Sequence, residues 1–368
     1  MEKTKFYSYK TNKHALPKGC QLCVKGQKLV LFITGLCPRH CIYCPISDKK
    51  YKKDITYANE WPTNDIKEII KEAELCDAKG AGITGGDPLC TIDRTIKFIK
   101  ALKKQFGKKF HIHLYTSLDL ITKSTLDKLE KAGLDELRIH PNIDNDKLWD
   151  KINLIKGYKF DLGIEIPAIP KKKRQIKSLI KHFAPHIKFI NLNELEVADN
   201  KVNKLLKLGY RTKSKLSYAV KGSEELAKEL LKFIEKNHPK LKVHYCTAKL
   251  KDKVQMAERI KRRAKNIAQP FDLITDEGTL YRGAIYAKKQ MLPTIVKCLS
   301  KTFEIPKKLI VIDENEKQER ILIASWILEK ISKKIKPCIS KNCNNIRLAF
   351  VEEYPTYDQF PIMIDYIN

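Results

Sequence analysis

Short apolar runs alternate with amphipathic segments through the first half of the chain. The first apolar run is 29–33, and the amphipathic segment after it begins near Thr63 or Asn64, either of which can cap a helix, and stops at Gly80. Its apolar residues recur at helical spacing: Ile66, Ile69, Ile70 and Ala73. A strand followed by a helix is therefore expected at the start of the main domain.

The same strand–helix unit then repeats at a regular period. Further strands are expected at 81–84, 110–115, 135–140, 161–167 and 189–194, with helices at 91–106 and 124–132 and two more before residues 161 and 189. Side chains alternate along each strand, so Leu137 and Ile139 oppose Arg138. One face can pack under helices, and the other carries polar groups near the C-terminal end. This pattern predicts an α/β fold, a (β/α)6 partial TIM-type barrel with its site at those strand ends.

The chain is expected to divide into four parts. They are an N-terminal extension at 1–27, the barrel at 28–200, a barrel-extending α/β segment at 201–269 and a small C-terminal α+β domain at 271–368. In the third part, a helix at 223–236 and a strand at 241–246 can add one more unit to the barrel, and Gln269-Pro270 marks the boundary. The last part is expected to hold strands at 280–286, 309–312, 346–353 and 361–366 and a long amphipathic helix at 316–333.

The composition fits a folded, water-soluble protein. Hydrophobic residues make up 43% of the 368 residues, enough for a core, and no segment approaches the ~18 apolar residues of a membrane span. The sequence starts with polar residues, and its 11 cysteines come without a secretion signal. We therefore expect a cytoplasmic protein in a reducing compartment, whose thiols bind metal or lie buried rather than form disulfides.

The formal net charge of +29 raises the question of a nucleic-acid partner. Lysine and arginine neutralise phosphates, so RNA is one expectation. The expected helix at 251–268 carries the densest basic cluster in the chain: Arg259, Lys261, Arg262, Arg263 and Lys265. Because lysine is abundant everywhere in the sequence, a merely solvated surface is an equal alternative.

Three cysteines follow the first strand within eight residues: Cys37, Cys41 and Cys44. Thiolates at C-x3-C-x2-C spacing on one loop can converge on an iron–sulfur cluster or on zinc. Zinc sites usually have paired C-x2-C units or histidine, and His40 is poorly placed to share a metal with its neighbour Cys41. A four-iron cluster normally takes four cysteines, so three would leave one iron free for a substrate or cofactor.

This loop resembles the signature of the radical S-adenosylmethionine (SAM) superfamily, and Tyr43, the aromatic residue before the last cysteine, matches it too. The resemblance implies a [4Fe-4S] cluster on Cys37, Cys41 and Cys44 whose open iron binds SAM. It also implies the partial barrel over about 28–200 and reductive cleavage of SAM to a 5′-deoxyadenosyl radical. Electrons would come from a donor such as ferredoxin or flavodoxin.

The segment Gly85-Gly86-Asp87-Pro88 ends the second expected strand. Consecutive glycines let the backbone approach a ligand closely, and a carboxylate there can pair with an ammonium group; a simple tight turn is the alternative. The segment resembles the superfamily's Gly-Gly-Glu-Pro, which holds the amino group of SAM, but here the acid is one methylene shorter.

Residues at the ends of later strands occupy positions where the superfamily contacts the ribose, carboxylate or methionine part of SAM. By this resemblance they are Tyr115, Ser117, Arg138, His140 and Glu165. A buried ion pair between Arg138 and Glu165, without ligand contact, is an equal alternative. No catalytic residue is singled out by the sequence.

A second cysteine pair, Cys20 and Cys23, precedes the first strand on what is expected to be a short loop. A C-x2-C pair is half a metal site, so a second cluster or zinc is one alternative and buried or unpaired thiols are the other. Its candidate partners are Cys246, Cys338 and Cys343. Because residues entering a strand lie opposite the loop that leaves it, this pair would have to double back to approach the cluster. Cys246, at the end of a barrel strand, could also donate a hydrogen atom or be inert.

Three segments, 193–196, 218–223 and 244–246, resemble archaeal-type radical SAM proteins that are often grouped with pyruvate formate-lyase activating enzymes. This resemblance does not by itself give the substrate. Three substrate classes remain open for such an enzyme. RNA (tRNA) modification is placed first because of the net charge, the basic helix and the C-terminal domain. A glycyl-radical enzyme activase acting on a partner protein is the alternative that the relatives imply, and a cofactor-biosynthetic enzyme acting on a small molecule is the third. A non-enzymatic iron–sulfur or zinc module is the remaining reading, and SAM cleavage would exclude it.

Overall fold

The computed structural model describes the chain apart from residues 5–6, 12–14, 314–318, 340–345 and 368, and apart from the side chains of 336–339. The chain divides into two compact units, Met1–Met256 and Ala257–Asn368. This division lies before Gln269-Pro270, where the sequence places the boundary, so it cuts through the expected basic helix. Each unit has a hydrophobic core of its own.

In the described part of the first unit, seven parallel strands form the centre of the sheet. In the order in which they lie side by side they are β3 (Leu29–Phe32), β6 (Gly80–Thr84), β7 (His111–Thr116), β8 (Glu136–Ile139), β9 (Asp161–Ala168), β10 (Phe189–Glu194) and β11 (Lys242–Cys246). The six predicted strands are confirmed, and the extra unit predicted after residue 200 supplies the seventh.

Short antiparallel strands continue this sheet at both edges. They are β4 (Tyr57–Ala58) and β5 (Trp61–Pro62) beyond β3, and β2 (Tyr9–Lys10) and β1 (Glu2–Lys3) beyond β11. Because these edge strands pair with β3 and β11 and not with each other, the sheet remains open. The fold is the predicted partial TIM-type barrel.

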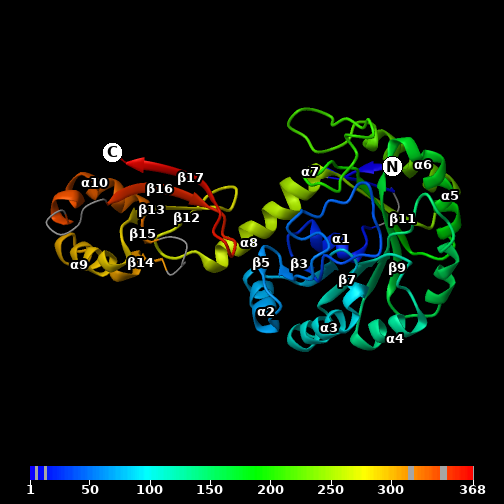
Figure 1. Ribbon diagram of the computed structural model, residues 1–368, viewed down its shortest axis with the longest axis horizontal. Coiled ribbons are helices and arrows are strands. Elements are labelled where there is room, and N and C mark those ends of the chain that lie inside the picture. Colours follow the sequence, from blue (N-terminus) through cyan, green and yellow to red (C-terminus); the bar gives the residue numbers. More distant parts are fainter. Residues whose placement is uncertain (5–6, 12–14, 314–318, 340–345, 368) are drawn as a thin grey trace. The chain divides into compact units, whose positions relative to one another are not determined.

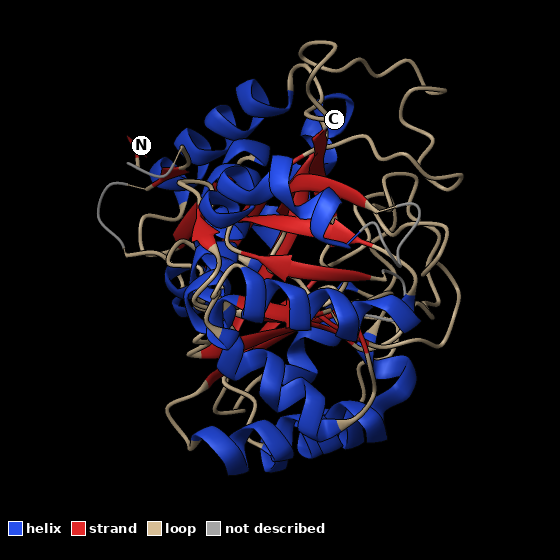
Figure 2. Cartoon of the chain, turned by 90° about the vertical axis from the view of Figure 1, so that its left-hand side faces the viewer, coloured by secondary structure: helices blue, strands red, loops and turns tan. Residues whose placement is uncertain are grey.

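Helices lie around the outside of these strands (Figure 1), and Figure 2 shows the same elements coloured by type. The helices of this unit are α1 (Lys18–Cys23), α2 (Ile66–Leu75), α3 (Ile92–Phe106), α4 (Lys123–Ala132), α5 (Lys173–Phe183), α6 (Ser223–Asn237) and α7 (Ala248–Leu250), and a π-helical turn follows at Lys251–Met256. Strand side chains that face the helices are fully buried, as Ile112 and Leu137 show. The opposite face of the strands is left to line the barrel interior.

The helix predicted before residue 161 is wrong. The structure has only a 3₁₀ helix there, at Trp149–Ile155. Before it, the side chain of Asn142 accepts a hydrogen bond from the backbone N of Asp144 (2.9 Å), and Asn145 does the same for Lys147 (3.0 Å). Such local bonds offer the backbone an alternative to an α-helix. Two other 3₁₀ turns, at Pro88–Thr91 and Pro170–Lys172, precede α3 and α5.

The structure also differs from the predictions at the start of α2 and in the segment that holds Cys20 and Cys23. The cap of α2 is Asp65, whose carboxylate accepts a hydrogen bond from the backbone N of Lys67 (2.7 Å); Thr63 instead accepts one from the backbone N of Asp65 (3.0 Å). Cys20 and Cys23 lie in the short helix α1 and not on a loop. That helix begins directly after a proline, a residue whose fixed φ suits the start of a helix.

The second unit is built on an antiparallel sheet. Its described strands are β12 (Leu273–Ile274), β13 (Leu280–Tyr286), β14 (Ile310–Ile312), β15 (Arg320–Ile323), β16 (Arg347–Glu353) and β17 (Pro361–Ile367), in the order β14-β15-β13-β16-β17 with β12 on β13. Its helices are α8 (Ala257–Ile267), α9 (Leu292–Thr302) and α10 (Ser325–Ile339), with 3₁₀ turns at Lys289–Met291 and Lys307–Leu309. The α+β class is as predicted.

The long helix predicted at 316–333 is wrong in its first part. Residues 314–318 lie outside the described residues, but β15 occupies 320–323 and α10 begins only at Ser325. The run Ile321-Leu322-Ile323 is buried between β13 and β14 in the sheet, and such β-branched runs favour strands. Helix α9 was not predicted at all.

Two further findings concern the chain as a whole. Among the described residues, no helix has both the length and the apolar character that crossing a membrane requires. Cys298 in α9 is disulfide-bonded, which corrects the expectation that the cysteines form no disulfides. Cys338 and Cys343, two candidate metal partners, lie outside the described side chains.

Candidate active site

A cavity of about 730 Å³ lies at the C-terminal ends of the barrel strands and reaches into the barrel. It is lined by the loop after β3, the loop after β6 and the ends of β7 to β10. Nearly all of the predicted site residues line this one cavity: Cys37, Cys41, Tyr43, Cys44, Gly85, Gly86, Asp87, Tyr115, Ser117, His140 and Glu165. Arg138 is the predicted residue that does not.

The glycine pair lets two loops of the cavity pass very close to each other. The backbone N of Gly86 donates to the carbonyl oxygen of Thr34, and that of Asp87 to the carbonyl oxygen of Leu36, both at 2.7 Å. A Cβ atom at Gly86 would collide with the Leu36 carbonyl, and one at Gly85, where φ is +150°, with that of Thr34. The glycines therefore hold the start of the cysteine loop against the end of β6.

Asp87 is 1% exposed and fastens the glycine loop to the end of β7. Its carboxylate accepts hydrogen bonds from the hydroxyl groups of Thr116 and Ser117 (both 2.8 Å) and from the backbone N of Ser117 and Leu89 (both 3.0 Å). Burial raises the pKa of Asp87, although these hydrogen bonds oppose the rise. The roles predicted for Asp87 and Ser117 toward SAM remain predictions, but the two residues act together here.

The cysteine loop is tied to the end of β8 through His140. Arg39 Nη1 donates to the backbone carbonyl of His140 (2.6 Å), and the Tyr43 hydroxyl lies 2.9 Å from His140 Nε2. His140 Nδ1 lies 2.7 Å from the backbone carbonyl of Glu165 and donates to it, since a carbonyl only accepts. Burial and the nearby Arg39 lower the pKa of His140 to about 4, so the ring is neutral and its Nε2 accepts from Tyr43.

A residue that the sequence did not suggest also supports the cysteine loop. The side-chain amide of Asn200 donates to the backbone carbonyls of Cys44 (3.0 Å) and Ile46 (2.9 Å), and the backbone N of Lys204 donates to Ile42 (2.8 Å). The segment after β10 thus packs on the loop that carries the cysteines. No local motif marks Asn200, because its partners lie more than 150 residues earlier in the chain.

Arg138 lies in a buried ion-pair network, which was one of its two predicted roles. It is 2% exposed, its Nε donates to Glu136 (2.6 Å), and its Nη1 donates to Glu165 (2.8 Å) and to the Tyr115 hydroxyl (3.1 Å). Burial alone would raise the pKa of Glu165, but Arg138 and hydrogen bonds from Asn191 and Asn193 outweigh it and hold that pKa below its usual range.

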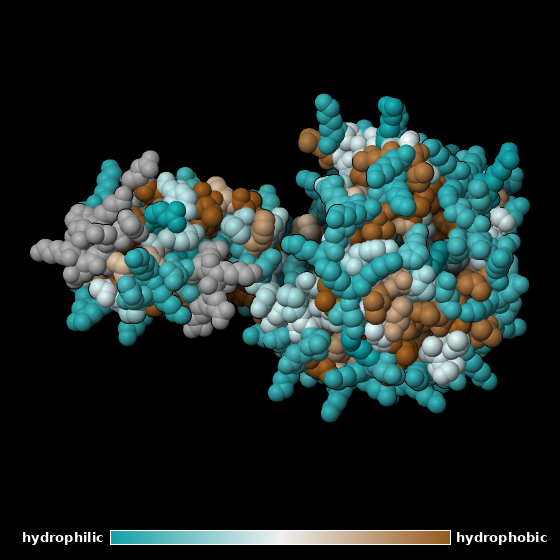
Figure 3. All heavy atoms as spheres, viewed as in Figure 1, coloured by the Kyte–Doolittle hydropathy of each residue, from teal (hydrophilic) through white to brown (hydrophobic). Residues whose placement is uncertain are grey.

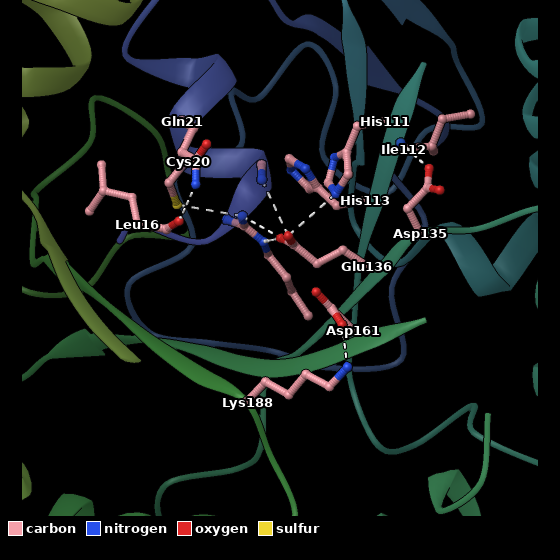
Figure 4. A network of polar contacts seen from close by, with 12 residues as sticks. Leu16, Cys20, Gln21, His111, Ile112, His113, Asp135, Glu136, Asp161 and Lys188 are labelled. Carbon is pink, nitrogen blue, oxygen red and sulfur yellow. Dashed lines mark hydrogen bonds and ion pairs between the residues drawn. The ribbon is translucent and has the colours of Figure 1, made fainter. Parts of the chain in front are cut away.

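Helix α1 lies against the lower, N-terminal part of the barrel strands (Figure 4). The backbone N of Gly19 donates to Glu136 (3.2 Å), and the sulfur of Cys20 lies 3.5 Å from Arg138 Nη2 and 3.3 Å from Asn191 Nδ2. Cys23, one turn later, lines the same cavity as the cluster loop. Cys23 therefore shares a cavity with the cluster cysteines, whereas Cys20 does not line it.

The donor set of the cysteine loop fits an iron–sulfur cluster, because its three thiols face one cavity beside the glycine loop. Among the described residues, no three or more His, Cys, Asp or Glu side chains are arranged around one metal position. Neither the three loop cysteines nor the pair Cys20 and Cys23 belongs to such a group. Burial raises the pKa of the Cys37 thiol to about 12, so ligation must compensate for removing that proton. When bound, the cluster supplies the electron that cleaves SAM.

An open parallel barrel with three cysteines and a glycine loop at one cavity defines an iron–sulfur enzyme of the partial-barrel class. A family model for the radical SAM superfamily matches residues 31–202. A protein from Methanocaldococcus jannaschii, provisionally named a glycyl-radical enzyme activating enzyme, is 43% identical over 358 residues, covering 94% of this chain and 92% of that protein. The chain belongs to the radical SAM superfamily, and it is an enzyme that uses a [4Fe-4S] cluster and SAM.

Other comparisons are more distant. A biotin synthase of Clostridium perfringens is 30% identical over 133 residues, 34% of this chain and 39% of that protein. The solved structure of coproporphyrinogen III oxidase from Escherichia coli, titled a radical SAM enzyme, has a TM-score of 0.36 at 11% identity over 90% of this chain and 94% of that one. A model for a domain of unknown function, DUF8061, matches residues 278–363 in the second unit.

Proposed function

We propose that the protein is a glycyl-radical enzyme activase, which uses SAM cleavage to remove a hydrogen atom from a glycine of a partner protein. The observation that carries the proposal is the 43% identity, over 94% of this chain, to the relative that bears this provisional name. The similarity spans both units, so the second unit belongs to the same proposed enzyme. A ferredoxin or flavodoxin is the proposed electron donor.

The mouth of the barrel supports a polypeptide substrate. A second cavity, of about 700 Å³, adjoins the first and shares Tyr43, His140 and Asn193 with it. It continues along 193–200, the segment that begins at the end of β10. A ligand that fills the first cavity beside the cluster loop would leave this second space for a loop of another protein.

Exposed apolar side chains on the segment after β10 also support a protein partner. Leu206 is 62% exposed, Leu216 98% and Tyr218 53%, and the last of these lines the second cavity. Large apolar side chains gathered on one exposed segment are a feature of protein-binding surfaces. Their segment is attached to the cysteine loop through Asn200, so a partner bound there would lie next to the radical source.

The test is anaerobic incubation of the reconstituted enzyme with SAM, a strong reductant and a purified candidate partner made with α-deuterated glycine. We expect the electron paramagnetic resonance signal of a glycyl radical in the partner and deuterium in the 5′-deoxyadenosine. The matched control is a partner in which the reactive glycine is replaced by alanine. The proposal would be overturned if a small polar metabolite stimulated SAM cleavage and no candidate partner protein did.

RNA modification gains less from the structure. Two of the five basic residues of the predicted cluster, Arg259 and Arg263, are buried in the second unit, and Arg263 donates to the backbone carbonyl of Pro355. Figure 3 shows hydrophilic side chains spread over the visible faces of both units and not gathered on one. The net charge of +29 remains the observation in favour of RNA, and the salt dependence of filter binding to tRNA would count the phosphate contacts.

A small polar substrate has a specific observation in its favour. The lower part of the first cavity is lined by Lys28, His113 and Tyr115, which are polar and held in one hydrogen-bonded chain: Lys28 Nζ lies 2.6 Å from His113 Nδ1, and His113 Nε2 lies 3.1 Å from the Tyr115 hydroxyl. Convergent polar groups deep in a cavity are typical of small-molecule sites. The metabolite arm of the experiment above tests this alternative.

A further inference from the structure

A buried ammonium group lies at the lower end of the 730 Å³ cavity. Lys28 is 5% exposed and lines the cavity directly before β3, whereas the cysteine loop follows the other end of that strand. Because a strand rises about 3.3 Å per residue, Lys28 lies roughly 13 Å below Phe32, the last residue of β3. A group bound to Lys28 therefore lies at the opposite end of the cavity from the cluster.

Lys28 has no carboxylate as an ion-pair partner among the residues that the structure describes. Its Nζ donates to the backbone carbonyl of Gly19 (2.9 Å) and to Nδ1 of His113 (2.6 Å), the nearer ring nitrogen. Burying a charge is costly unless an opposite charge pairs with it. Because an ammonium group has three N–H donors, these two contacts leave one for a ligand.

The direction of the hydrogen bonds leaves a second donor beside Lys28. Nδ1 of His113 accepts from the ammonium group, so the ring proton is on Nε2 and is donated to the Tyr115 hydroxyl oxygen (3.1 Å). That oxygen also accepts from Nη1 of Arg138 (3.1 Å). Among the described contacts, the O–H proton of Tyr115 has no acceptor of its own.

The carboxylates that line the same cavity are already engaged. Asp87 accepts from the hydroxyl and backbone N of Ser117, among others, and Glu165 accepts from Arg138 and from two asparagine side chains. Neither is an ion-pair partner of Lys28 in the described part of the chain. The lower end of the cavity therefore offers unused donors, and its own acids do not occupy them.

Open space lies directly above Lys28. Val30, the next residue on the same face of β3, lines the cavity and is 44% exposed. Its neighbour on β6 is Gly82, which also lines the cavity, and a Cβ atom there would lie 2.8 Å from Nε2 of His113. The absence of a side chain at Gly82 thus leaves room for a ligand group to reach Lys28.

We propose that Lys28 and Tyr115 bind a carboxylate of the substrate at the lower end of the cavity. The two free donors match the two oxygens of a carboxylate, and the ammonium group supplies the opposite charge. SAM also carries a carboxylate, but the superfamily binds SAM at the cluster, which lies at the other end. This assigns Tyr115 to the substrate, whereas the family resemblance assigns it to SAM.

The carboxylate site itself does not depend on the proposed function. One finer assignment does rest on it: for a glycyl-radical activase, the carboxylate is the side chain of an Asp or Glu close to the reactive glycine of the partner. The radical still removes the hydrogen atom directly from that glycine. Lys28 holds the neighbouring residue and is a specificity-determining residue.

The competing role of Lys28 is structural. Glu136 and Glu165 both pair with Arg138, and Lys28 could balance the second negative charge without contacting it. A structural Lys28 predicts that Lys28→Met lowers the unfolding temperature of the ligand-free protein and leaves carboxylate binding unchanged, a result that would overturn the proposal. We expect the unfolding temperature to stay the same or to rise, because the variant removes a buried charge that has no ion-pair partner.

Binding of a small carboxylate tests the site without knowledge of the substrate. The probe is propionate, observed by saturation-transfer NMR with the reconstituted holoenzyme and saturating SAM, and propionamide is its uncharged counterpart. We expect a saturable propionate signal in wild type, its loss in Lys28→Met and no signal from propionamide. The matched control is Lys18→Met, which removes an exposed lysine of α1 and should keep the signal.

Two results of this experiment would overturn the proposal. Equal propionate signals in Lys18→Met and Lys28→Met, or no saturable signal in wild type, would mean that the carboxylate meets surface lysines only. Displacement of propionate by SAM, together with SAM binding that is about tenfold weaker in Lys28→Met, would assign the site to the carboxylate of SAM instead.

A partner protein tests the finer assignment. Lys28→Met should raise the KM for the partner roughly tenfold to hundredfold, the effect of losing one charge-assisted hydrogen bond. Replacing the acidic residue near the reactive glycine by its amide should have a similar effect in wild type and none in Lys28→Met. A glycyl radical formed with equal KM by wild type and Lys28→Met would overturn the assignment and leave the proposed function in place. Propionate bound at Lys28, without a glycyl radical in any partner, would overturn the proposed function and leave the carboxylate site.

Discussion

The phenol oxygen of Tyr43 lies 2.9 Å from Nε2 of His140, and this contact joins the cysteine loop to the C-terminal end of β8. His140 in turn donates to the carbonyl of Glu165 at β9 and accepts Arg39 at its own carbonyl. One neutral histidine thus connects the cluster loop with two barrel strands. The His140 side chain therefore helps to position the loop, although no cysteine contacts it among the described hydrogen bonds.

Replacing His140 should loosen the cluster without unfolding the barrel. We expect His140→Ala to lose iron faster when the protein is diluted into a chelator, because Tyr43 loses its hydrogen-bond partner and the bond to the Glu165 carbonyl is lost, while the bond from Arg39 to the backbone carbonyl remains. Tyr43→Phe removes one hydrogen bond, worth about 1 kcal/mol, and should have a smaller effect in the same direction. Iron content against time and the rate of 5′-deoxyadenosine formation measure both. Equal iron retention in His140→Ala and wild type would contradict the anchoring role.

Gly86→Ala should displace the cysteine loop. The added Cβ would collide with the backbone carbonyl of Leu36, and backbone cannot rotate away as a side chain can. We expect loss of cluster absorbance after reconstitution. The control is Gly107→Ala, where φ is +79° and ψ 176° but no atom lies within 4 Å of the new Cβ; it should cost about 1–3 kcal/mol of stability and leave the cluster intact. Equal cluster yields in the two variants would exclude the steric argument.

The cluster loop and the barrel could be predicted from the sequence because both are local patterns. Cys37 to Cys44 is a spacing motif, and strands such as 189–194 show their period directly. The contacts of Asn200 and the cavity position of Cys23 could not be predicted, because each joins segments far apart in the chain. Helix propensity also failed at Arg320–Ile323, where burial in a sheet decides the structure.

Replacing Arg138 distinguishes the two roles that the sequence left open for it, contact with SAM and a buried ion pair. Arg138→Met leaves Glu136 and Glu165 without their partner inside the barrel, and breaking a buried pair in this way costs about 3–5 kcal/mol. We expect a large fall in the thermal unfolding temperature, partly reversed when Glu136→Gln and Glu165→Gln are added. A variant that unfolds like wild type but binds SAM weakly would show instead that Arg138 serves the ligand.

Metal content tests both the cluster assignment and the second site. We expect the Cys37/Cys41/Cys44 triple alanine variant, purified anaerobically, to contain no iron and to leave SAM uncleaved. Cys20→Ala and Cys246→Ala are the matched controls, and each should keep the wild-type iron content. Iron or zinc remaining in the triple variant would establish a second metal site, for which Cys20 and Cys23 are the candidates.

His244 should make the protein's stability depend on pH. It lies on β11, is 1% exposed, and neither ring nitrogen has a hydrogen-bond partner among the described residues. Burial, helped by the charge of Arg138 and opposed by that of Glu165, lowers its pKa to about 4, whereas the unfolded chain has a value near 6.5. Between those two pH values the unfolded state binds more protons, so the free energy of unfolding rises with pH and levels off above about 6.5.

The contribution of His244 is therefore fully present at neutral pH and is lost as the pH falls toward 4. A difference of about 2.5 pKa units corresponds to about 3 kcal/mol, as an order of magnitude. We expect His244→Phe, which fills a similar volume without a titrating group, to flatten the rise in stability between about pH 5 and 6.5, the range set by these values. Urea unfolding of wild type and variant across this range measures it. Parallel curves for the two proteins would show that His244 is charged in the folded state or exposed to water.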